Sequence, residues 1–423
     1  MPTRSLHIAW LGPAPSADGG VPGVACDLLE GLTALGHRID CFFPSSGQPI
    51  PERLQGNERI SFNWGTANWN WDTWYSRTRI MAFVSGLVVR GLATVRLRRQ
   101  IVSGHERDPY DLIYQFSTIE GLAVPRRMLH TVPLVIHPET HAAGELRSLI
   151  AERGLALRFQ SRARFATIAA IMAVRAAVQR LRIHDASLLI CISSVFRDHM
   201  VRDYRFPARS TAVVPNPVRI ARFEASPKPL SDPPCVLVLG RIAARKGLED
   251  VVAVARLLRD QGTPVKIRIV GGPSLSSDYT GLLGDLPPET AEYVGPVPAS
   301  EVPREIDGSD VLLQASHYEP FALTVAEALA SGVPVVATTE VGAVEGVDRY
   351  VAAAVPPGDV GAMARAITDM IAHVRQDPSE TSSRARAEAE RLFAADVVCQ
   401  EISSALADLA ASGVETAGRL SAT

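Results

Sequence analysis

The chain has 423 residues, 47% of them hydrophobic, and its 43 basic and 45 acidic side chains nearly cancel to a formal net charge of −2. This length is enough for two domains or more, each with its own core. The near-neutral charge argues against a general nucleic-acid-binding protein, which needs a basic excess. Only three of the basic residues are lysine (Lys228, Lys246 and Lys266), so each lysine stands out in this sequence.

The cysteines and the apolar segments exclude further classes of protein. The five cysteines are far apart and include no Cys-x-x-Cys pair, which predicts reduced thiols in a cytoplasmic protein rather than disulfides or a zinc site. The longest apolar candidate for a membrane span, Phe165 to Val174, is far shorter than the roughly 20 residues that a span needs.

Short apolar runs alternate with longer helical patterns along the whole chain. In the first half, the predicted strands are 6–12, 38–44, 112–116, 133–137, 188–193 and 211–216. In the second half, they are 235–241, 265–272, 292–297, 311–316 and 334–339. Continuous apolar runs separated by helices are typical of parallel strands that are buried on both faces. The sequence therefore predicts an α/β fold with two doubly wound, Rossmann-like parallel-sheet domains.

The boundary between the two domains is predicted in a proline-rich segment. Residues 218–234 contain Pro227, Pro229, Pro233 and Pro234 and little apolar periodicity, as expected of a linker. We expect an N-terminal domain at 1–217, a linker at 218–234, a C-terminal domain at 235–395, and a helix and tail at 396–423. Ligands of such sheets bind at the carboxyl ends of the strands, so the domains should face each other across a cleft.

The first motif that can carry chemistry follows the first strand of the second domain. Gly240-Arg241 and Lys246-Gly247 lie in the loop before a helix that is predicted from Leu248. The free amides and the dipole of a helix N-terminus attract anions, and two cations there favour a phosphate or diphosphate. A solvated basic turn is the alternative interpretation of this cluster alone.

The second motif follows the strand at 311–316. Glu319 lies in the loop after this strand, and Glu327 lies about one turn into the next helix. Carboxylates at these positions accept hydrogen bonds from sugar or ribose hydroxyls, and amides around Phe321 and Leu323 can face a phosphate or a sugar. Glu327 alone could be a helix-surface residue, but two carboxylates and two cations on adjacent loops favour a binding site.

In these motifs and in their order, the sequence resembles the retaining glycosyltransferases of the GT-B fold, in the large family 4 group. The motifs are Gly19-Gly20, Leu35-Gly36-His37, Pro215-Asn216-Pro217, Gly-Arg-x4-Lys-Gly at 240–247, Glu-x7-Glu at 319–327, Gly332-Val333-Pro334, Gly342 with Glu345, and Val355-Pro356-Pro357-Gly358-Asp359. The resemblance covers nearly the whole chain and is strongest over 235–360.

The resemblance implies the GT-B architecture and the transfer of a sugar from a UDP- or GDP-linked donor to an acceptor hydroxyl with retention. It also implies that the domain at 1–217 binds the acceptor, that the domain at 235–395 binds the donor, and that the tail at 396–423 can return to the N-terminal domain. It implies that Arg241 and Lys246 bind the donor diphosphate, that Glu327 holds the ribose, and that Glu319 lies against the transferred sugar. His137 matches the family's N-domain histidine near the sugar hydroxyls, and the nearby His141 leaves that assignment open. The remaining donor-binding positions are Gly20, Gly240, Phe321, Ala322 and Leu323.

Two departures from the family pattern bear on substrate choice. Ala322 stands where the family usually has glycine, so its methyl group either narrows the sugar pocket or forces a different backbone conformation if glycine adopted a positive φ. The first-domain loop Gly19-Gly20-Val21-Pro22-Gly23 contains an unusual proline.

The chain contains no Asp-x-Asp pair, so we expect protein cations rather than a metal to neutralise the diphosphate. No cofactor is expected beyond the donor substrate, and the acceptor is a carbohydrate, a lipid-linked molecule or a small molecule. A dinucleotide oxidoreductase is disfavoured because no Gly-x-Gly-x-x-Gly is followed by an acid. A nucleotide-sugar-binding GT-B protein without transfer, or a related sugar phosphorylase or epimerase, remains as an alternative.

Two segments outside these motifs are rich in arginine, at 77–107 and 146–182. The second is interpreted as a basic amphipathic helix, which either lies on an anionic inner membrane or presents a solvated face. A tryptophan-rich segment with Trp64, Trp69, Trp71 and Trp74 is either an acceptor wall or a packed loop or partner contact.

Overall fold

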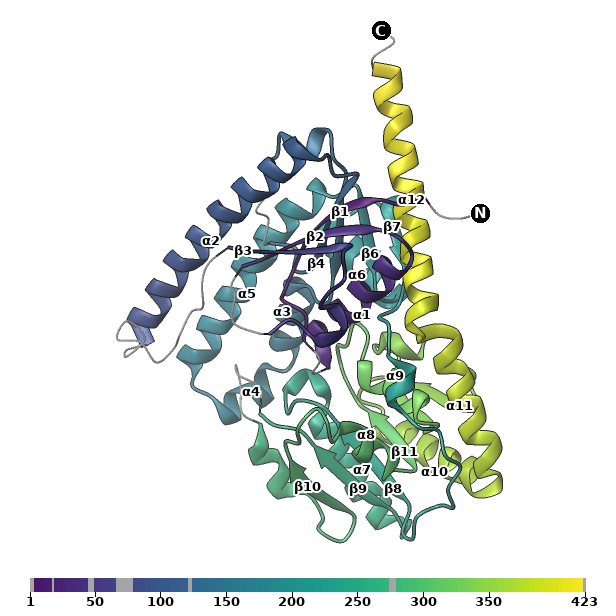
Figure 1. Cartoon of the computed structure of the whole chain (residues 1–423). Helices are drawn as coiled ribbons and strands as arrows, with labels where there is room; N and C mark the ends of the chain where they lie inside the picture. The colour runs from purple at the N-terminus through teal and green to yellow at the C-terminus, as the bar shows by residue number, and fades with distance from the viewer. Residues whose placement is uncertain are drawn as a thin grey trace.

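The computed structural model describes residues 4–16, 19–44, 49–65, 79–120, 124–273 and 279–420, and the strands in these ranges form two parallel sheets (Figure 1). The seven-stranded sheet has the order β3-β2-β1-β4-β5-β6-β7. Its strands are β1 (His7–Leu11), β2 (Arg38–Phe43), β3 (Ile60–Trp64), β4 (Leu112–Ser117), β5 (Leu134–Pro138), β6 (Leu188–Cys191) and β7 (Thr211–Val213). The six-stranded sheet has the order β10-β9-β8-β11-β12-β13. Its strands are β8 (Cys235–Leu239), β9 (Lys266–Val270), β10 (Ala291–Gly295), β11 (Val311–Gln314), β12 (Val335–Thr338) and β13 (Ala352–Val355).

Helices cover the sheets and connect their strands. The N-domain, built on the first sheet, carries α1 (Gly20–Ala34), α2 (Arg79–Arg107), α3 (Ala142–Ala151), α4 (Arg153–Phe159), α5 (Arg162–Arg182) and α6 (Ser194–Tyr204). The C-domain, built on the second sheet, carries α7 (Leu248–Asp260), α8 (Val302–Asp307), α9 (Leu323–Ala330), α10 (Val360–Gln376) and α11 (Pro378–Phe393), and α12 (Ala395–Leu420) follows. The predicted architecture of two doubly wound parallel sheets is confirmed.

The sequence explains why most of these strands form. The middle strands are buried on both faces; Ile8, Ala9 and Trp10 of β1 have no exposed surface, and such runs need parallel neighbours to pair their backbone groups. All the predicted strands are present, most of them a residue or two shorter than predicted. β3 and β13 were not predicted, and both are edge strands.

Capping residues set the ends of several helices. The hydroxyl of Ser161 accepts from the amide of Arg164 at the start of α5. The carboxylates of Asp359 and Asp377 do the same at the starts of α10 and α11. These bonds satisfy amides that lack a partner in the first turn of a helix.

The arginine-rich segment 146–182 is not one amphipathic helix, as the sequence suggested, but the end of α3, then α4, then α5. Glu152 is both the C-cap of α3 and the N-cap of α4. Gln160, the C-cap of α4, has an extended backbone, so the helix ends there before α5 begins. Trp69, Trp71 and Trp74 lie outside the described residues, so their interpretation stays a prediction.

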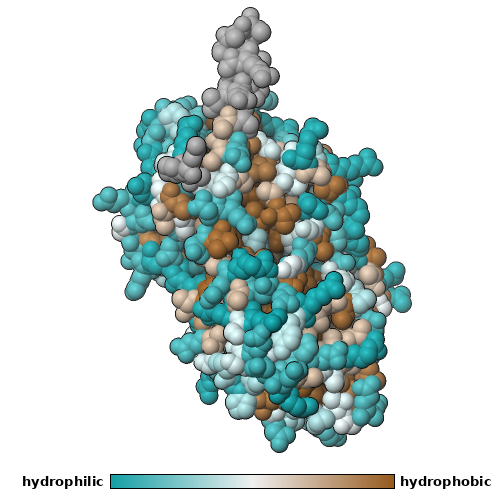
Figure 2. All heavy atoms as spheres, turned by 90° about the vertical axis from the view of Figure 1, so that its right-hand side faces the viewer, coloured by the Kyte–Doolittle hydropathy of each residue, from teal (hydrophilic) through white to brown (hydrophobic). Residues whose placement is uncertain are grey.

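The C-terminal helices run along both domains. In Figure 1, α11 lies beside the C-domain and α12 continues along the N-domain. α12 packs on α1, where a Cβ added to Gly31 would lie 2.4 Å from the sulfur of Cys399. The Nε2 atom of His37, after α1, lies 2.7 Å from the hydroxyl of Ser403. Figure 2 shows this side of the molecule, on which hydrophobic patches are interspersed among hydrophilic residues.

The five cysteines are free and buried, as the sequence predicted. Within the part of the chain that the structure describes, no helix is both long and apolar enough to cross a membrane.

Candidate active site

A cavity of about 580 Å³ lies between the two domains, where strands of both sheets end. The N-domain contributes Gly20 and the first turn of α1 to its wall, and the C-domain contributes Leu323 and Glu327 of α9. Arg219 and Arg222, from the segment between the sheets, also line it, as do Asp27, Glu52 and Arg53 of the N-domain. Of the residues that the sequence assigned to donor binding, the structure places Gly20, Leu323 and Glu327 around this cavity.

Gly20 begins α1 with φ +69°, and no side chain caps this helix. The positive φ favours glycine at this position. Uncapped amides at a helix N-terminus carry partial positive charge, so this side of the cavity suits an anion.

Glu327 lies in α9 and is half-buried. Burial raises the pKa of its carboxyl to about 7, and the positive charge of Arg222 opposes this rise. No hydrogen bond to this carboxylate is found among the described residues, so both oxygens are available to a ligand.

Lys246 and Glu319 form an ion pair at the end of β8 and β11. Arg245 Nη1 lies 3.1 Å from the same carboxylate oxygen of Glu319 and 3.0 Å from the Tyr318 carbonyl oxygen. Burial alone would raise the pKa of Glu319, but Lys246 and Arg245 lower it to about 2. Glu319 is therefore ionised throughout the neutral range. Arg245, which lies between the two parts of the Gly-Arg-x4-Lys-Gly motif, was given no role from the sequence.

Gly247 allows this loop to turn directly into α7. It has φ +66°, and a Cβ atom at this position would lie 2.0 Å from the Ala315 carbonyl oxygen. Only glycine fits both the conformation and the space. Gly240 and Arg241 border a small cavity together with Lys246, and the Arg241 side chain is exposed. The two predicted cations, Arg241 and Lys246, therefore border the same small cavity.

The loop before α9 resolves the question raised by Ala322. Ala322 adopts φ 80°, the conformation that glycine prefers, so the methyl group is accommodated at the cost of backbone strain. Phe321 is almost fully buried and packs edge-on against Phe393, with ring centroids 5.6 Å apart. Phe321 is thus a core residue, and only its backbone can serve a ligand.

The two candidate histidines of the N-domain differ in their partners. His141 is bonded on both ring nitrogens, by Asp203 at 2.7 Å and by the Tyr318 hydroxyl at 2.6 Å. His137 Nδ1 lies 2.6 Å from the Tyr114 hydroxyl, whereas its Nε2 has no hydrogen-bond partner among the described residues. His137 is therefore the one that can still bind a ligand, while His141 joins the two domains.

Further contacts hold the N-domain against the loops that carry Glu319. The Glu345 carboxylate accepts from the amides of Ser194 and Val195, each at 2.7 Å, at the N-terminus of α6. The Ser193 hydroxyl donates to the Pro320 carbonyl at 2.7 Å. Glu345 belongs to a motif that the sequence quoted, but this role needs a partner 150 residues away and could not be predicted.

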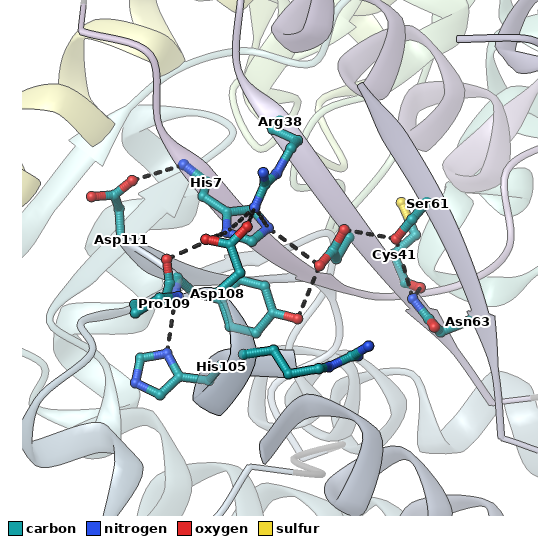
Figure 3. Close-up of polar contacts among 12 residues, drawn as sticks. His7, Arg38, Cys41, Ser61, Asn63, His105, Asp108, Pro109 and Asp111 are labelled. Atoms are coloured by element: carbon teal, nitrogen blue, oxygen red, sulfur yellow. Dashed lines mark hydrogen bonds and ion pairs between the residues drawn. The ribbon is translucent and has the colours of Figure 1, made fainter. Parts of the chain in front are cut away.

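A second polar cluster lies at the amino ends of β1 and β2, away from the interdomain cavity (Figure 3). Asp40 accepts hydrogen bonds from Ser61 at 2.7 Å and from Tyr110 at 3.0 Å, and it lies 3.2 Å from His7 Nε2. Burial would raise the pKa of Asp40, but these three bonds lower it to about 2. The cluster borders a cavity of about 500 Å³, and Arg38 pairs with Asp108 beside it. We interpret this cluster as structural, because its charged groups are bonded to one another.

Two family models match adjoining parts of the chain. Residues 18–222 match the model described as Glycosyltransferase Family 4, and residues 221–390 match the model described as Glycosyl transferases group 1. Together they cover both domains.

Curated relatives are about a quarter identical to this chain over the segments that align. It is 26% identical over 239 residues to a glycogen synthase of Mycobacterium tuberculosis, covering 55% of this chain and 56% of the relative. It is 28% identical over 190 residues to an amylovoran biosynthesis glycosyltransferase of Erwinia amylovora, covering 43% of this chain and 46% of the relative. The chain thus spans about half the length of these relatives.

Solved structures match nearly the whole chain. Sucrose-phosphate synthase from Thermosynechococcus elongatus superposes with a TM-score of 0.67 and 20% identity, covering 97% of this chain and 100% of the other. The Anabaena protein HepE in complex with UDP-glucose has a TM-score of 0.60 and 18% identity, covering 95% and 100%. At this identity, the likeness shows the fold, which is GT-B.

Proposed function

We propose that this chain, which belongs to the family 4 glycosyltransferases with the GT-B fold, transfers a hexose from a nucleoside-diphosphate sugar to an acceptor hydroxyl. The observation that carries the proposal is the pairing of Lys246 and Arg245 with Glu319 in the loops after β8 and β11, together with Glu327 in the wall of the interdomain cavity. Cations, an ionised carboxylate and a second carboxylate are thus brought together by loops from the ends of parallel strands.

Lys246 and Arg241, which border the same small cavity, are proposed to bind the donor diphosphate. Cleavage of the sugar–phosphate bond leaves negative charge on the phosphate, and preorganised cations stabilise it in the transition state. Because these side chains supply the charge, we propose that the transfer needs no metal ion. Activity that is unchanged after treatment with EDTA is the expected result.

Glu327 is proposed to bind the ribose hydroxyls of the donor. Its carboxylate faces the cavity and has no bond to a described residue, so it can accept from two hydroxyls at once. A UDP- or GDP-linked sugar is the proposed donor. The presence of UDP-glucose in the similar HepE structure supports a nucleotide donor of this type.

Retention of the anomeric configuration is proposed to proceed by substitution on one face of the sugar. Glu319 is tied to two cations, which weakens it as a nucleophile and favours an ion-pair-like substitution over a covalent intermediate. In such a substitution, the departing diphosphate itself supplies the negative charge beside the positively charged sugar, and the cations stabilise that diphosphate. NMR spectroscopy of the purified product tests this step, because inversion would produce the opposite anomer.

Nucleotide release is the experiment that tests the proposed function. The purified protein is incubated with a panel of UDP- and GDP-sugars, alone and with a mixture of acceptors, and the released nucleoside diphosphate is measured. Glu327→Ala should abolish most of the release, whereas Lys266→Ala should not, since Lys266 donates to the Pro288 carbonyl far from the motif loops. Donor binding without release under any condition would favour a nucleotide-sugar-binding protein without transfer.

We also propose that the N-domain contacts an anionic membrane surface in the cytoplasm, where a lipid-linked acceptor would be reached. One side of α5 exposes Ile171, Val174, Val178 and Leu181 at 52%, 65%, 38% and 71% of their surface. Arg162, Arg164 and Arg180 of the same helix are exposed too, and this combination suits anionic headgroups over an apolar interior. Flotation with phosphatidylglycerol vesicles at low salt should carry the protein upward, and Val174→Glu with Leu181→Glu should prevent it. Failure of the wild-type protein to bind would end this part of the proposal.

A further inference from the structure

The side chain of Tyr318 lies in the interface between the two domains. Tyr318 belongs to the loop after β11 of the C-domain, directly before Glu319, and yet it is only 4% exposed. Its ring stacks on His199 of α6, with ring centroids 5.7 Å apart, and contacts His141 at the start of α3 edge-on, also at 5.7 Å. A C-domain tyrosine is thus buried among side chains of the N-domain.

Gly144 in α3 makes room for this ring. A Cβ atom added to Gly144 would lie 2.6 Å from Tyr318 Cζ and 2.7 Å from the hydroxyl oxygen. Such distances are well below the contact distance of non-bonded atoms, so a larger side chain would displace the tyrosine. Glycine is a poor helix former, and the close approach of Tyr318 is a reason for its presence in this helix. The surface of the N-domain is therefore shaped to receive the ring.

Two hydrogen bonds continue from the ring into the N-domain. The Tyr318 hydroxyl lies 2.6 Å from His141 Nδ1, and His141 Nε2 lies 2.7 Å from Asp203 Oδ2. Burial raises the pKa of Tyr318 and lowers the pKa of His141. Burial would also raise the pKa of Asp203, but the bonds from His141 and Arg202 lower it to about 2. At neutral pH the tyrosine is protonated, the imidazole is neutral and the aspartate is ionised.

These protonation states fix the direction of both bonds. The ionised Asp203 can only accept, so the single ring proton of His141 lies on Nε2, and Nδ1 accepts from the Tyr318 hydroxyl. Asp203 is held in turn by Arg147, whose two terminal nitrogens lie 2.9 and 2.6 Å from its oxygens. The tyrosine is therefore anchored through His141 to a fixed carboxylate of α6.

The backbone around Tyr318 holds the charged groups of the candidate active site. The Tyr318 carbonyl accepts from Arg245 Nη1 at 3.0 Å, and the same nitrogen lies 3.1 Å from Glu319 Oε2. This carboxylate oxygen also pairs with Lys246. The amide of His317 donates to the Arg245 carbonyl at 2.9 Å. A shift of the Tyr318 ring would therefore move Glu319 and both of its cationic partners.

We propose that Tyr318 is a positioning residue, whose hydrogen bond to His141 fixes the Lys246–Glu319 pair against the N-domain. The inference rests on the proposed function, since the transfer needs groups of both domains in register. Tyr318 acts through its neighbours, because its hydroxyl is directed to His141. A displacement of about 1 Å in a reacting group can cost on the order of 100-fold in rate, so one bond across the interface can control turnover.

The test removes one oxygen atom. Tyr318→Phe deletes the hydroxyl and keeps the ring that stacks on His199 and fits against Gly144. Tyr204→Phe is the matched control, because the Tyr204 hydroxyl is also buried and donates to Gln179 Oε1 at 2.5 Å, but both of these residues lie in the N-domain. For each protein, kcat and donor KM are measured by nucleotide release with acceptor present, and calorimetry gives the affinity for UDP or GDP and the unfolding midpoint.

The positioning role predicts a loss of kcat alone. Tyr318→Phe should lower kcat about tenfold or more, while its donor KM and its affinity for the free nucleotide stay at the wild-type values. Tyr204→Phe should lower the unfolding midpoint and keep the wild-type kcat. His141→Phe breaks the same bond as Tyr318→Phe, so the double variant should lose no more kcat than the more affected single variant.

Three results overturn the positioning role. The first is a wild-type kcat in Tyr318→Phe. The second is an equal fall of kcat in Tyr318→Phe and Tyr204→Phe, which would show a general loss of folded protein. The third is a pair of losses in Tyr318→Phe and His141→Phe that multiply in the double variant, because the hydroxyl would then act on another group. A wild-type protein that releases no nucleotide from any donor would instead overturn the proposed function, and the positioning role with it.

Discussion

The N-domain sheet carries a histidine–carboxylate cluster at each end, and the two clusters differ in how their hydrogen bonds are completed. At the amino end, Asp40 is bonded to His7, Ser61 and Tyr110. At the carboxyl end, His137 and Glu139 each keep an atom without a partner among the described residues. Both clusters combine the same residue types in the same sheet. We therefore interpret the amino-end cluster as structural, whereas the carboxyl-end cluster keeps polar atoms that a bound molecule can still pair.

The pKa values follow the same division. The bonds at the amino end lower the pKa of Asp40 to about 2 despite its burial. At the carboxyl end, burial raises the pKa of Glu139 to about 7, although the bond from Asn216 opposes it. Asp40 is thus held in its charged form by its neighbours. Glu139 has one bond, from Asn216, and its Oε1 atom has no hydrogen-bond partner among the described residues.

The Lys246–Glu319 pair departs from this comparison. Both side chains already have ion-pair partners within the protein, and yet Lys246 is proposed to act in the transfer. We expect Lys246→Ala to lower kcat by about 100-fold or more, since removing one group that stabilises transition-state charge has effects of this size. The thermal unfolding midpoint should fall, because Glu319 loses one of its two cationic partners, but Arg245 remains and the variant should stay folded at the assay temperature. Nucleotide release at saturating donor is the measurement, with Lys266→Ala as the control. Release within threefold of the wild type would remove Lys246 from the mechanism.

Asp40→Asn tests the structural cluster. Losing a charged acceptor of three bonds should lower the free energy of unfolding by about 1–2 kcal/mol and leave kcat/KM unchanged at temperatures where the protein is folded. Urea denaturation followed by circular dichroism gives the first quantity, and nucleotide release gives the second. A specific loss of kcat/KM in the folded variant would mean that the amino-end cluster also serves the reaction.

His317 is a further histidine with carboxylate partners, and it lies between the domains: it contacts Glu152 of the N-domain and Asp250 of the C-domain. Hydrogen bonds to Asp250 and Glu152 raise its pKa to about 10, with Glu249 also nearby. A raised pKa of this kind gives stability that is complete below the unfolded pKa of about 6.5 and is lost as the pH rises through 10. His317→Gln should therefore destabilise the protein by about 1–3 kcal/mol at pH 6 and by much less at pH 10.5.

Unfolding of the wild type and His317→Gln in urea at the two pH values measures this difference. An equal loss of stability at both pH values would show that the contact is one of packing rather than charge.

The smallest expected effect concerns backbone strain near the cavity. Ala322, in the loop before α9, adopts a positive φ of 80°. Ala322→Gly should raise the free energy of unfolding by about 1 kcal/mol, because glycine adopts this conformation without strain. Thermal unfolding by calorimetry should show a small rise of the midpoint. A lower midpoint would mean that the alanine methyl group contributes packing that outweighs the strain.

Much of the fold followed from the sequence because buried parallel strands leave a simple pattern. The two strands that escaped prediction illustrate its limit. β13 is the alanine-rich Ala352–Val355, which has little strand propensity, and β3 is Ile60–Trp64, which begins beside charged residues and is less buried. Both occupy an edge of their sheet, where a strand needs only one partner and a weaker pattern is enough.

The sequence predicted only part of the site. The residues that it missed are brought together by tertiary contacts between distant parts of the chain. Lys246, Glu319 and Glu327 lie in local motifs, and the structure brings the first two into contact and places the third at the cavity. Glu139 depends on Asn216, 77 residues further along the chain. The sequence quoted Asn216 without a role and did not single out Glu139, since no local spacing reveals such a pair.

The most direct test of the account is the rate of nucleotide release per folded molecule, measured side by side for the wild type, Lys246→Ala and Asp40→Asn. The account predicts that the wild type releases nucleotide from at least one UDP- or GDP-sugar, that Lys246→Ala loses about 100-fold or more, and that Asp40→Asn, although less stable, releases it at the wild-type rate. Equal losses in both variants, or full activity in Lys246→Ala, would contradict the placement of the reaction at the carboxyl ends of the strands.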